Sequence, residues 1–252
     1  MAPSGAILLL DPRIGSRRTA SEGRVTTAPR RCGVGWVLMP LLGCSGSPAV
    51  VDALPRPPSF LVVTLDTTRA DVLSPYGGPP QLTPTASRLA ADGVVFERAY
   101  TVTPLTIPAH ASLHSGFLPP RHGVRDNGDF RLADDVVTLA ERFSAAGWHT
   151  MASVGAEVTR SHWGFGQGFD QYFDTMPAGT GGGRWRVERS GAAVVDDAIG
   201  WLADTDGPFF AWVHLFDAHH PYVAPAPWSD QWADRPYLAA VAFADAQLGR
   251  LV

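Results

Sequence analysis

The sequence predicts an α/β protein whose central sheet is mostly parallel and is covered by helices on both faces. Apolar runs of strand length alternate along the chain with segments of helical periodicity, the order typical of parallel sheets with crossover helices. The strand runs are continuously apolar, as expected for strands that are buried on both faces. The chain has 252 residues, of which 45% are apolar and 17% charged, so it can bury one large core or two small ones.

The first strand is expected at residues 59–66, SFLVVTLD, an apolar run that ends in an acid. A helix follows, with Thr83 as its N-cap, Pro84 in its first turn and Gly93 as its end. Residues 94–100, VVFERAY, then have the composition of a second strand. This part of the chain therefore predicts a strand, a helix and a strand in succession.

The rest of the chain repeats the alternation of helices and strands. A helix is expected to begin near Pro108, and the glycine-rich residues 178–184 are expected to form a surface loop. No internal repeat is visible, so one α/β domain is expected over residues 59–252. Helical patterns cover residues 138–147, 192–204 and 237–252, and buried strands are expected at residues 148–155 and 208–217.

Charge and cysteine content exclude several kinds of function. The net charge of −4 does not indicate a nucleic-acid surface. All twenty basic residues are arginines, so the chain has no catalytic lysine. The two cysteines, Cys32 and Cys44, lie near the N-terminus, so the body of the chain has no disulfide, cysteine metal ligand or cysteine nucleophile.

The N-terminal region differs in character from the rest of the chain. Residues 1–44 are expected to be a disordered terminus followed by a lipoprotein signal peptide, and residues 45–58 a linker rich in Pro and Ser. The apolar run 32–43 follows two arginines and ends in Leu-Leu-Gly before Cys44, which resembles a bacterial lipobox. A short buried core helix is the alternative. Lipidation of Cys44 predicts an exported protein that a lipid anchor holds at a membrane of the cell envelope.

Polar groups follow two of the expected strands, where open α/β sheets place their chemistry. Asp66 ends the first strand, and residues 214–220, HLFDAHH, end the last. A third segment, TVTPLTIPAH, places Thr106 and His110 on either side of Pro108 at the expected start of a helix. The positive end of a helix dipole can lower the pKa of a hydroxyl group held there. One interpretation is therefore that Thr106 is a nucleophile held at a helix N-terminus, and the alternative is a loop that is rich in Thr and Pro.

Five blocks of residues occur in the order seen in sulfatases, members of the alkaline-phosphatase superfamily, which the chain resembles over residues 59–252. The blocks are LDTTRADVLSPYGG, TPTASRLAADGVVFERAYT, PLTIPAHASLHSGFLPPRHGVRDNG, GFDQYFD and WVHLFDAHHPY. The resemblance implies an α/β sandwich around a large mixed sheet. It also implies a metal-dependent hydrolase or transferase that acts on sulfate or phosphate esters.

The resemblance assigns Asp66 and Thr106 to the catalytic centre. Asp66 matches the acid that binds the divalent metal, although the next position, often a second aspartate ligand, is Thr67. Thr106 matches the nucleophile, a group that the metal also contacts and activates. The alternatives are a helix N-cap or a salt bridge with Arg69 for Asp66, and a simple N-cap for Thr106.

The threonine at position 106 leaves the substrate open. Sulfatases carry a Cys or Ser there that is converted to formylglycine, and Thr106 cannot supply that aldehyde. Other branches of the superfamily use an unmodified Thr or Ser alkoxide against phosphoesters. The expected metal is Ca²⁺ if the enzyme is sulfatase-like and Zn²⁺ or Mn²⁺ if it is phosphoesterase-like. The expected substrate is a small-molecule or glycan ester.

Three histidines complete the candidate site. His110 stands where the family commonly has an arginine that braces the nucleophile, and a histidine can still orient a hydroxyl group. His122 matches a family loop near the site, with a structural hydrogen bond as its alternative role. His219 matches the histidine on the leaving-group side of the ester and is preferred over His220.

The family pattern continues, after the last helix of this chain, to a second metal-binding block of Asp, then His or Asn, then Gly. The chain ends at Val252 inside that helix, so a C-terminally incomplete domain is expected. The chain is expected to be a fragment of a longer ester hydrolase or transferase, or a degenerate family member. The alternative function is a catalytically inactive sulfatase fold that serves as a binding module.

Overall fold

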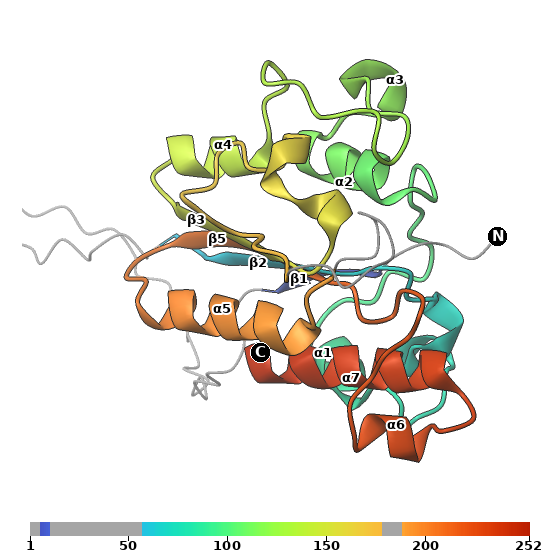
Figure 1. The fold of residues 1–252 in the computed structure, drawn as a ribbon. Helices are drawn as coiled ribbons and strands as arrows, with labels where there is room; N and C mark the ends of the chain where they lie inside the picture. The colour runs from blue at the N-terminus through green and yellow to red at the C-terminus, as the bar shows by residue number, and fades with distance from the viewer. Residues whose placement is uncertain (1–5, 11–56, 178–187) are drawn as a thin grey trace, which may run out of the picture.

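A five-stranded sheet forms the centre of the molecule (Figure 1). The structure, a computed structural model, describes residues 6–10, 57–177 and 188–252. Strands β2, β5, β3 and β4 run parallel, and β1 is antiparallel to β2, which confirms a mixed, mostly parallel sheet. In spatial order the strands are β1 (Ala6–Leu10), β2 (Phe60–Leu65), β5 (Phe209–Leu215), β3 (His149–Val154) and β4 (Gln171–Phe173).

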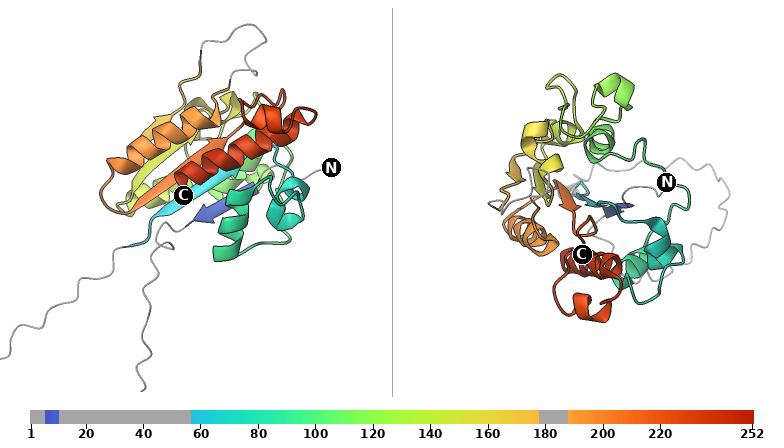
Figure 2. Two further views of the ribbon diagram at one scale, coloured as in Figure 1. Left: turned by 90° about the horizontal axis from the view of Figure 1, so that it is seen from below. Right: turned by 45° about the vertical axis from the view of Figure 1, so that its right-hand side comes forward.

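Helices cover both faces of this sheet, as the sequence predicts. Helices α2 and α4 lie on one face, and α1, α5 and α7 lie on the other (Figure 1). The view of the second face in Figure 2 shows α5 and α7 along the strands. The helices are α1 (Pro84–Asp92), α2 (Thr106–Ser115), α3 (Pro119–His122), α4 (Leu139–Ala145), α5 (Gly191–Ala203), α6 (Trp228–Gln231) and α7 (Pro236–Leu251).

The continuous apolar runs are explained by two cores, one on each face of the sheet. Val63 of β2 packs with Val194 of α5 and Leu248 of α7 on one face. The next residue back along the strand, Val62, packs with Ile107 of α2 on the other. Because neighbouring residues of a strand point to opposite faces, both must be apolar when both faces are covered.

Helix α1 receives its N-terminal cap from a distant part of the chain. Thr83 occupies the N-cap position as predicted, but its hydroxyl donates to Ser74 Oγ at 2.9 Å and caps no helical N–H. Asp245 of α7 caps the helix instead, because its two carboxylate oxygens accept the backbone N–H groups of Thr85 and Ala86, each at 2.9 Å. This buried carboxylate therefore joins α7 to the positive end of α1.

The prediction of a second strand at residues 94–100 is wrong. This segment is an exposed loop, in which Val94, Phe96 and Tyr100 are 80%, 70% and 84% exposed. The edge of β2 pairs instead with β1, from Ala6 opposite Leu65 to Leu10 opposite Leu61. A strand-like composition shows that a segment can form a strand, but it does not select the sheet edge that the segment joins.

The N-terminal region is described only in part. Ala6–Leu10 forms β1, within the segment that the sequence predicts to be a disordered N-terminus before the signal peptide. Cys44, most of the predicted linker and the predicted loop at residues 178–184 lie outside the described residues. Within the described ranges, no helix is both long enough and apolar enough to cross a membrane.

Candidate active site

The carboxyl ends of β2 and β5 bring two of the predicted polar segments together. The two strands are parallel neighbours whose register places Leu65 beside Leu215. The backbone N–H of Asp66 continues this pairing by donating to the carbonyl of Leu215 at 2.9 Å. Asp66 and the loop after β5, which carries His219, consequently leave the same edge of the sheet.

Asp66 is the buried acid of the site, with 5% of its surface exposed. Its Oδ1 accepts the N–H of Thr67 at 2.9 Å, and its Oδ2 accepts the hydroxyl of Thr106 at 3.3 Å. Burial raises the pKa of the Asp66 carboxyl, and positive charge on His110 or His219 acts in the opposite direction. The structure thus gathers Asp66, Thr106, His110 and His219 at one place. The predicted alternative of a salt bridge with Arg69 is wrong, because Arg69 pairs with Asp71.

Thr106 is the first residue of α2, and its hydroxyl is directed at Asp66. The N-cap of α2 is Leu105, so the alternative role of Thr106 as a simple N-cap is wrong. The helix also begins two residues before Pro108, which is therefore not its starting residue. A side chain supplies the missing cap contact, because Asn127 Oδ1 accepts the N–H of Ile107 at 2.9 Å. The Thr106 hydroxyl is left free for the site.

His110 lies one helical turn after Thr106 and faces the same site. Its Nδ1 lies 2.8 Å from the Thr106 carbonyl oxygen. A carbonyl can only accept, so Nδ1 carries the proton and Nε2 carries the lone pair. Burial lowers the pKa of His110, and the negative charge of Asp66 opposes this shift. His110 is therefore a neutral imidazole held by the backbone of the residue that it was predicted to brace.

Two further buried histidines adjoin His110. The sequence did not single out His114, and it indicated His214 only as part of the polar segment 214–220. His114 follows one turn later on α2, and its ring centroid lies 4.3 Å from that of Trp212. His214 of β5 meets His110 edge to face at 4.8 Å. Burial lowers the pKa of His114 to about 3 and that of His214 well below its usual value. The spacing of four residues between His110 and His114 was the sequence signal for this cluster.

Thr64 joins His214 to Trp212. The Nε1–H group of Trp212 donates to Thr64 Oγ1 at 3.1 Å, and Thr64 Oγ1 lies 2.7 Å from His214 Nδ1. The second ring nitrogen, Nε2, is buried without a hydrogen-bond partner among the described residues.

His219 occupies the loop after β5 and stacks on Phe216, with ring centroids 4.3 Å apart. Its Nδ1 lies 2.8 Å from the carbonyl oxygen of His220, so Nδ1 donates and Nε2 is available for other partners. The adjacent His220 ring packs edge to face against Tyr222 instead, at 5.6 Å. The two neighbouring histidines therefore have different surroundings.

His122 has structural contacts on α3. Its Nδ1 accepts the N–H of Val124 at 3.1 Å, so Nε2 carries the proton and donates to Ser112 Oγ at 2.9 Å. The bond to Ser112 attaches α3 to α2, and the bond to Val124 holds the chain just after α3. The arrangement matches the alternative structural role of His122, whose hydrogen bonds do not go to Asp66 or Thr106.

Thr67 has a left-handed backbone, with φ of 49°, and joins two loops at the site. Its hydroxyl donates to the Ala218 carbonyl at 2.8 Å, and its own carbonyl accepts the Tyr237 hydroxyl at 3.0 Å. The side chain that replaces the family's second aspartate is thus engaged in structural bonds. Asp66 and Thr106 together offer two ligand oxygens.

The described residues do not by themselves fit a divalent metal. Within these ranges, no three side chains of His, Cys, Asp or Glu are grouped so that they could hold an ion. Calcium takes six to eight oxygen ligands and zinc usually four ligands, so two oxygens fall short of either requirement.

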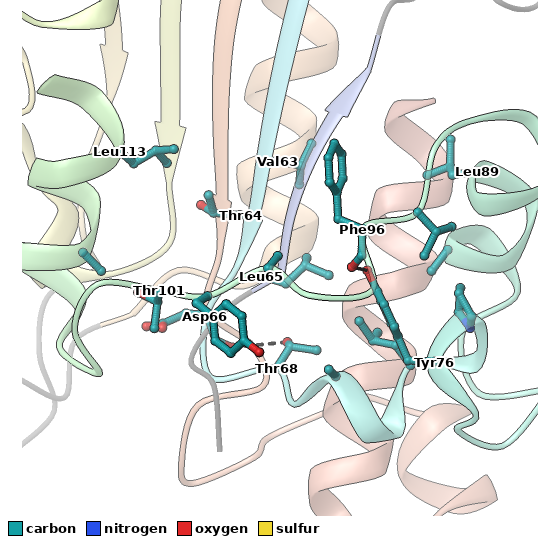
Figure 3. A pocket seen from close by; sticks show the side chains of 18 of the residues that line it. Val63, Thr64, Leu65, Asp66, Thr68, Tyr76, Leu89, Phe96, Thr101 and Leu113 are labelled. Carbon is teal, nitrogen blue, oxygen red and sulfur yellow. Dashed lines mark hydrogen bonds between the residues drawn. The ribbon is translucent and has the colours of Figure 1, made fainter. Parts of the chain in front are cut away.

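A cavity of about 290 Å³ opens beside Asp66 and Thr106 (Figure 3). Leu105, Ala109 and Leu113 of the α2 region line one side, and Leu89 of α1 and Phe96 of the exposed loop line another. Figure 3 shows Asp66 and Thr68 at one end and Leu89 and Phe96 toward the other. The cavity is mainly apolar away from the carboxylate.

Comparison with known proteins identifies the family. The family model described as Sulfatase matches residues 58–252. The chain belongs to the sulfatase family. Among its relatives is the uncharacterized sulfatase YidJ of Escherichia coli K12, which is 28% identical over 211 residues, or 71% of this chain and 42% of that protein. This sulfatase-family chain therefore spans less than half the length of YidJ.

Solved structures of the alkaline-phosphatase superfamily share its fold. The putative sulfatase YidJ of Bacteroides fragilis superimposes with a TM-score of 0.64 at 17% identity, covering 83% of this chain and 59% of that one. The phosphonate monoester hydrolase of Agrobacterium radiobacter gives a TM-score of 0.61 at 20% identity, covering 76% and 57%. Ps i-CgsB, solved with a neocarrahexaose, gives a TM-score of 0.64 at 18% identity, covering 76% of this chain and 53% of that one. At these identities the likeness establishes the fold alone.

Proposed function

We propose that this sulfatase-family chain forms part of an ester hydrolase in which Thr106 is the nucleophile and the ester is preferentially a phosphate or phosphonate. The observation that carries the proposal is the hydrogen bond from the Thr106 hydroxyl to the buried carboxylate of Asp66, at the start of α2. A hydroxyl is a poor nucleophile until a base or a positive field withdraws its proton. Asp66 and the N-terminus of α2 provide both.

The reaction has two displacement steps. Thr106 Oγ attacks the phosphorus, its proton passes to Asp66 Oδ2, and the bond from phosphorus to the alcohol oxygen breaks. His219 Nε2, when protonated, gives its proton to the departing alkoxide. A water molecule then attacks the phosphorus and gives a proton to His219 Nε2. The bond from phosphorus to Thr106 Oγ breaks as Asp66 returns its proton to that oxygen, which releases phosphate and restores the hydroxyl. The raised pKa of the Asp66 carboxyl favours its role as proton acceptor.

The side chain at position 106 supports a phosphorus ester over a sulfate ester. The formylglycine route implied for sulfatases needs a Cys or Ser precursor, and this position holds a threonine. One structural neighbour is a phosphonate monoester hydrolase, which supports a phosphorus ester as the substrate. The apolar cavity beside Thr106 has room for the organic group of a small-molecule or glycan ester.

Covalent trapping tests this proposal. The protein is incubated with 4-nitrophenyl phosphate or 4-nitrophenyl sulfate, quenched in acid and digested, and the peptide that contains Thr106 is examined by mass spectrometry. We expect a phosphoryl group on Thr106 and no sulfuryl group. A sulfuryl adduct, or a phosphoryl group on a different residue, would contradict the assignment.

Sulfatase-family enzymes generally use divalent metals, and Asp66 and Thr106 are the residues of this chain that would contribute ligands. The described residues lack a complete ligand set, so no step above depends on a metal. We propose that a metal, Ca²⁺ for sulfate or Zn²⁺ or Mn²⁺ for phosphate chemistry, requires further ligands from beyond the described ranges.

We also propose that the protein is exported and anchored to the cell envelope through a lipid on Cys44. The apolar run that precedes Cys44 supports this proposal. Expression in a bacterial host with labelled palmitate should label the wild type, and Cys44→Ser should lose the label and move to the soluble fraction. Label that persists in Cys44→Ser would refute the anchor.

A further inference from the structure

Asp217 is an acid in the loop after β5 that the mechanism above does not use. It lies two residues before His219, and its Oδ2 is buried without a hydrogen-bond partner among the described residues. Burial raises the pKa of the Asp217 carboxyl to about 6. A buried carboxylate oxygen without a partner reduces stability, so its presence calls for a specific role.

The carboxylate of Asp217 is seated on the first residue of α5. Its Oδ1 accepts the N–H of Gly191 at 2.8 Å. A Cβ atom added to Gly191 would lie 2.4 Å from Oδ2 and 3.1 Å from the carboxyl carbon, closer than non-bonded atoms allow. Residue 191 therefore has to be glycine for Asp217 to approach. The helix is thirteen residues long, so its N-terminal dipole favours the negative charge of the carboxylate.

The same loop has a second anchor on its other side. The carbonyl of Ala218 accepts the hydroxyl of Thr67, whose N–H donates to Asp66. Asp217 thus ties the loop to α5, and Ala218 ties it to the residue beside the catalytic carboxylate. His219 is the next residue, and its N–H donates to the Phe216 carbonyl at 3.0 Å. The position of His219 is therefore determined by the two anchors that precede it.

We propose that Asp217 is a positioning residue for His219, acting through its bond to Gly191 at the start of α5. This inference rests on the proposed function, because it concerns the step in which His219 protonates the departing alkoxide. Without the bond from Asp217 to Gly191, the loop loses one of these two hydrogen-bonded anchors and the His219 ring moves relative to Thr106. Binding of the ester and attack by Thr106 are left intact, so kcat should fall while KM changes little.

Two substitutions remove the anchor, and each has a matched control. Asp217→Ala deletes the carboxylate, with the exposed Asp206→Ala as control. Gly191→Ala inserts a methyl group against the carboxylate, with Gly200→Ala as control, because a Cβ at Gly200 of the same helix meets nothing within 4 Å. Alanine also favours helix over glycine, so Gly191→Ala is not expected to unfold α5.

The leaving group separates a positioning role from general destabilisation. 4-Nitrophenolate departs without a proton, whereas an alkyl alkoxide needs one. We expect Asp217→Ala and Gly191→Ala to lower kcat for an alkyl phosphate ester by about tenfold or more and for 4-nitrophenyl phosphate by less than about threefold. His219→Ala should show the same selectivity, and both controls should behave as wild type. Equal losses on the two esters would overturn the proposal.

Hydrogen–deuterium exchange tests the anchor without any need for activity. The N–H of Gly191 has Asp217 as its hydrogen-bond partner, so Asp217→Ala should exchange this amide about tenfold faster or more, while the rest of α5 is unchanged. An unchanged exchange rate would overturn the anchor. If the wild type hydrolyses neither ester, the proposed function fails together with the catalytic part of this inference, whereas the exchange rate still decides the anchor.

Discussion

Thr106→Ala is expected to lower kcat for phosphate ester hydrolysis by about a thousandfold or more, with little change in KM. The substitution removes the oxygen that forms the covalent bond. The methyl group that remains keeps the first turn of α2 in place, because Leu105 and not Thr106 is the N-cap. Steady-state kinetics with 4-nitrophenyl phosphate measure the loss.

Two further threonine variants make the comparison specific. Thr106→Ser retains the hydroxyl and should keep measurable turnover. Thr205→Ala alters a threonine that does not line the cavity and whose hydroxyl donates to the Trp201 carbonyl, so it should resemble wild type. Sulfate ester hydrolysis by the wild type that is unchanged in Thr106→Ala would contradict both the nucleophile and the preferred substrate.

His114→Phe is expected to make the protein more resistant to acid. Both ring nitrogens of His114 are buried without hydrogen-bond partners in the described structure, and burial lowers its pKa to about 3. An unfolded histidine has a pKa near 6.5. Between these values the unfolded chain binds a proton that the folded chain does not, so His114 reduces stability as the pH falls. At pH 4.5 the proton bound by the unfolded histidine lowers the free energy of unfolding by about 3 kcal/mol.

Denaturant unfolding at pH 7 and pH 4.5 measures this effect. The wild type should lose more stability between the two pH values than His114→Phe, and His149→Gln, which alters an exposed histidine, should behave as wild type. Asp217 has the opposite effect on the free energy of unfolding. Because burial raises its pKa to about 6, the folded state binds a proton at a higher pH than the unfolded state does, so Asp217 adds stability as the pH falls. That contribution is common to all three proteins and cancels. Equal acid sensitivity of wild type and His114→Phe would show that His114 titrates normally.

The composition of the candidate site could be predicted from the sequence because the relevant residues follow recognisable elements. Asp66 ends a continuous apolar strand, and His219 follows another, so their meeting depends only on the two strands being parallel neighbours. Thr106 belongs to a segment with clear helical potential. The structure brings these residues together with His110, whereas His122 has hydrogen bonds to Ser112 and Val124.

The start of α2 and the pairing of the sheet edge could not be predicted in the same way. Pro108 signals the first turn of a helix, but the bond from Ile107 to Asn127 Oδ1, which comes from a loop twenty residues later, supports an earlier start. Residues 94–100 carry a strand pattern, yet β1 occupies the edge of β2. A local pattern indicates which element a segment can form. The cap of a helix and the neighbour of an edge strand depend instead on which distant segment packs against them.

The sequence by itself determined the alternation of strands and helices, the two apolar faces of the sheet and the set of residues at the strand ends. These properties follow from the hydrophobic periodicity and the residue types, both of which can be seen directly in the sequence. The tertiary structure alone decided that Asp217 contacts Gly191, that Asp245 caps α1 and that His114 is a neutral buried base. Each depends on contact between segments far apart in the chain, and on the loss of water around a polar group, which no local pattern encodes.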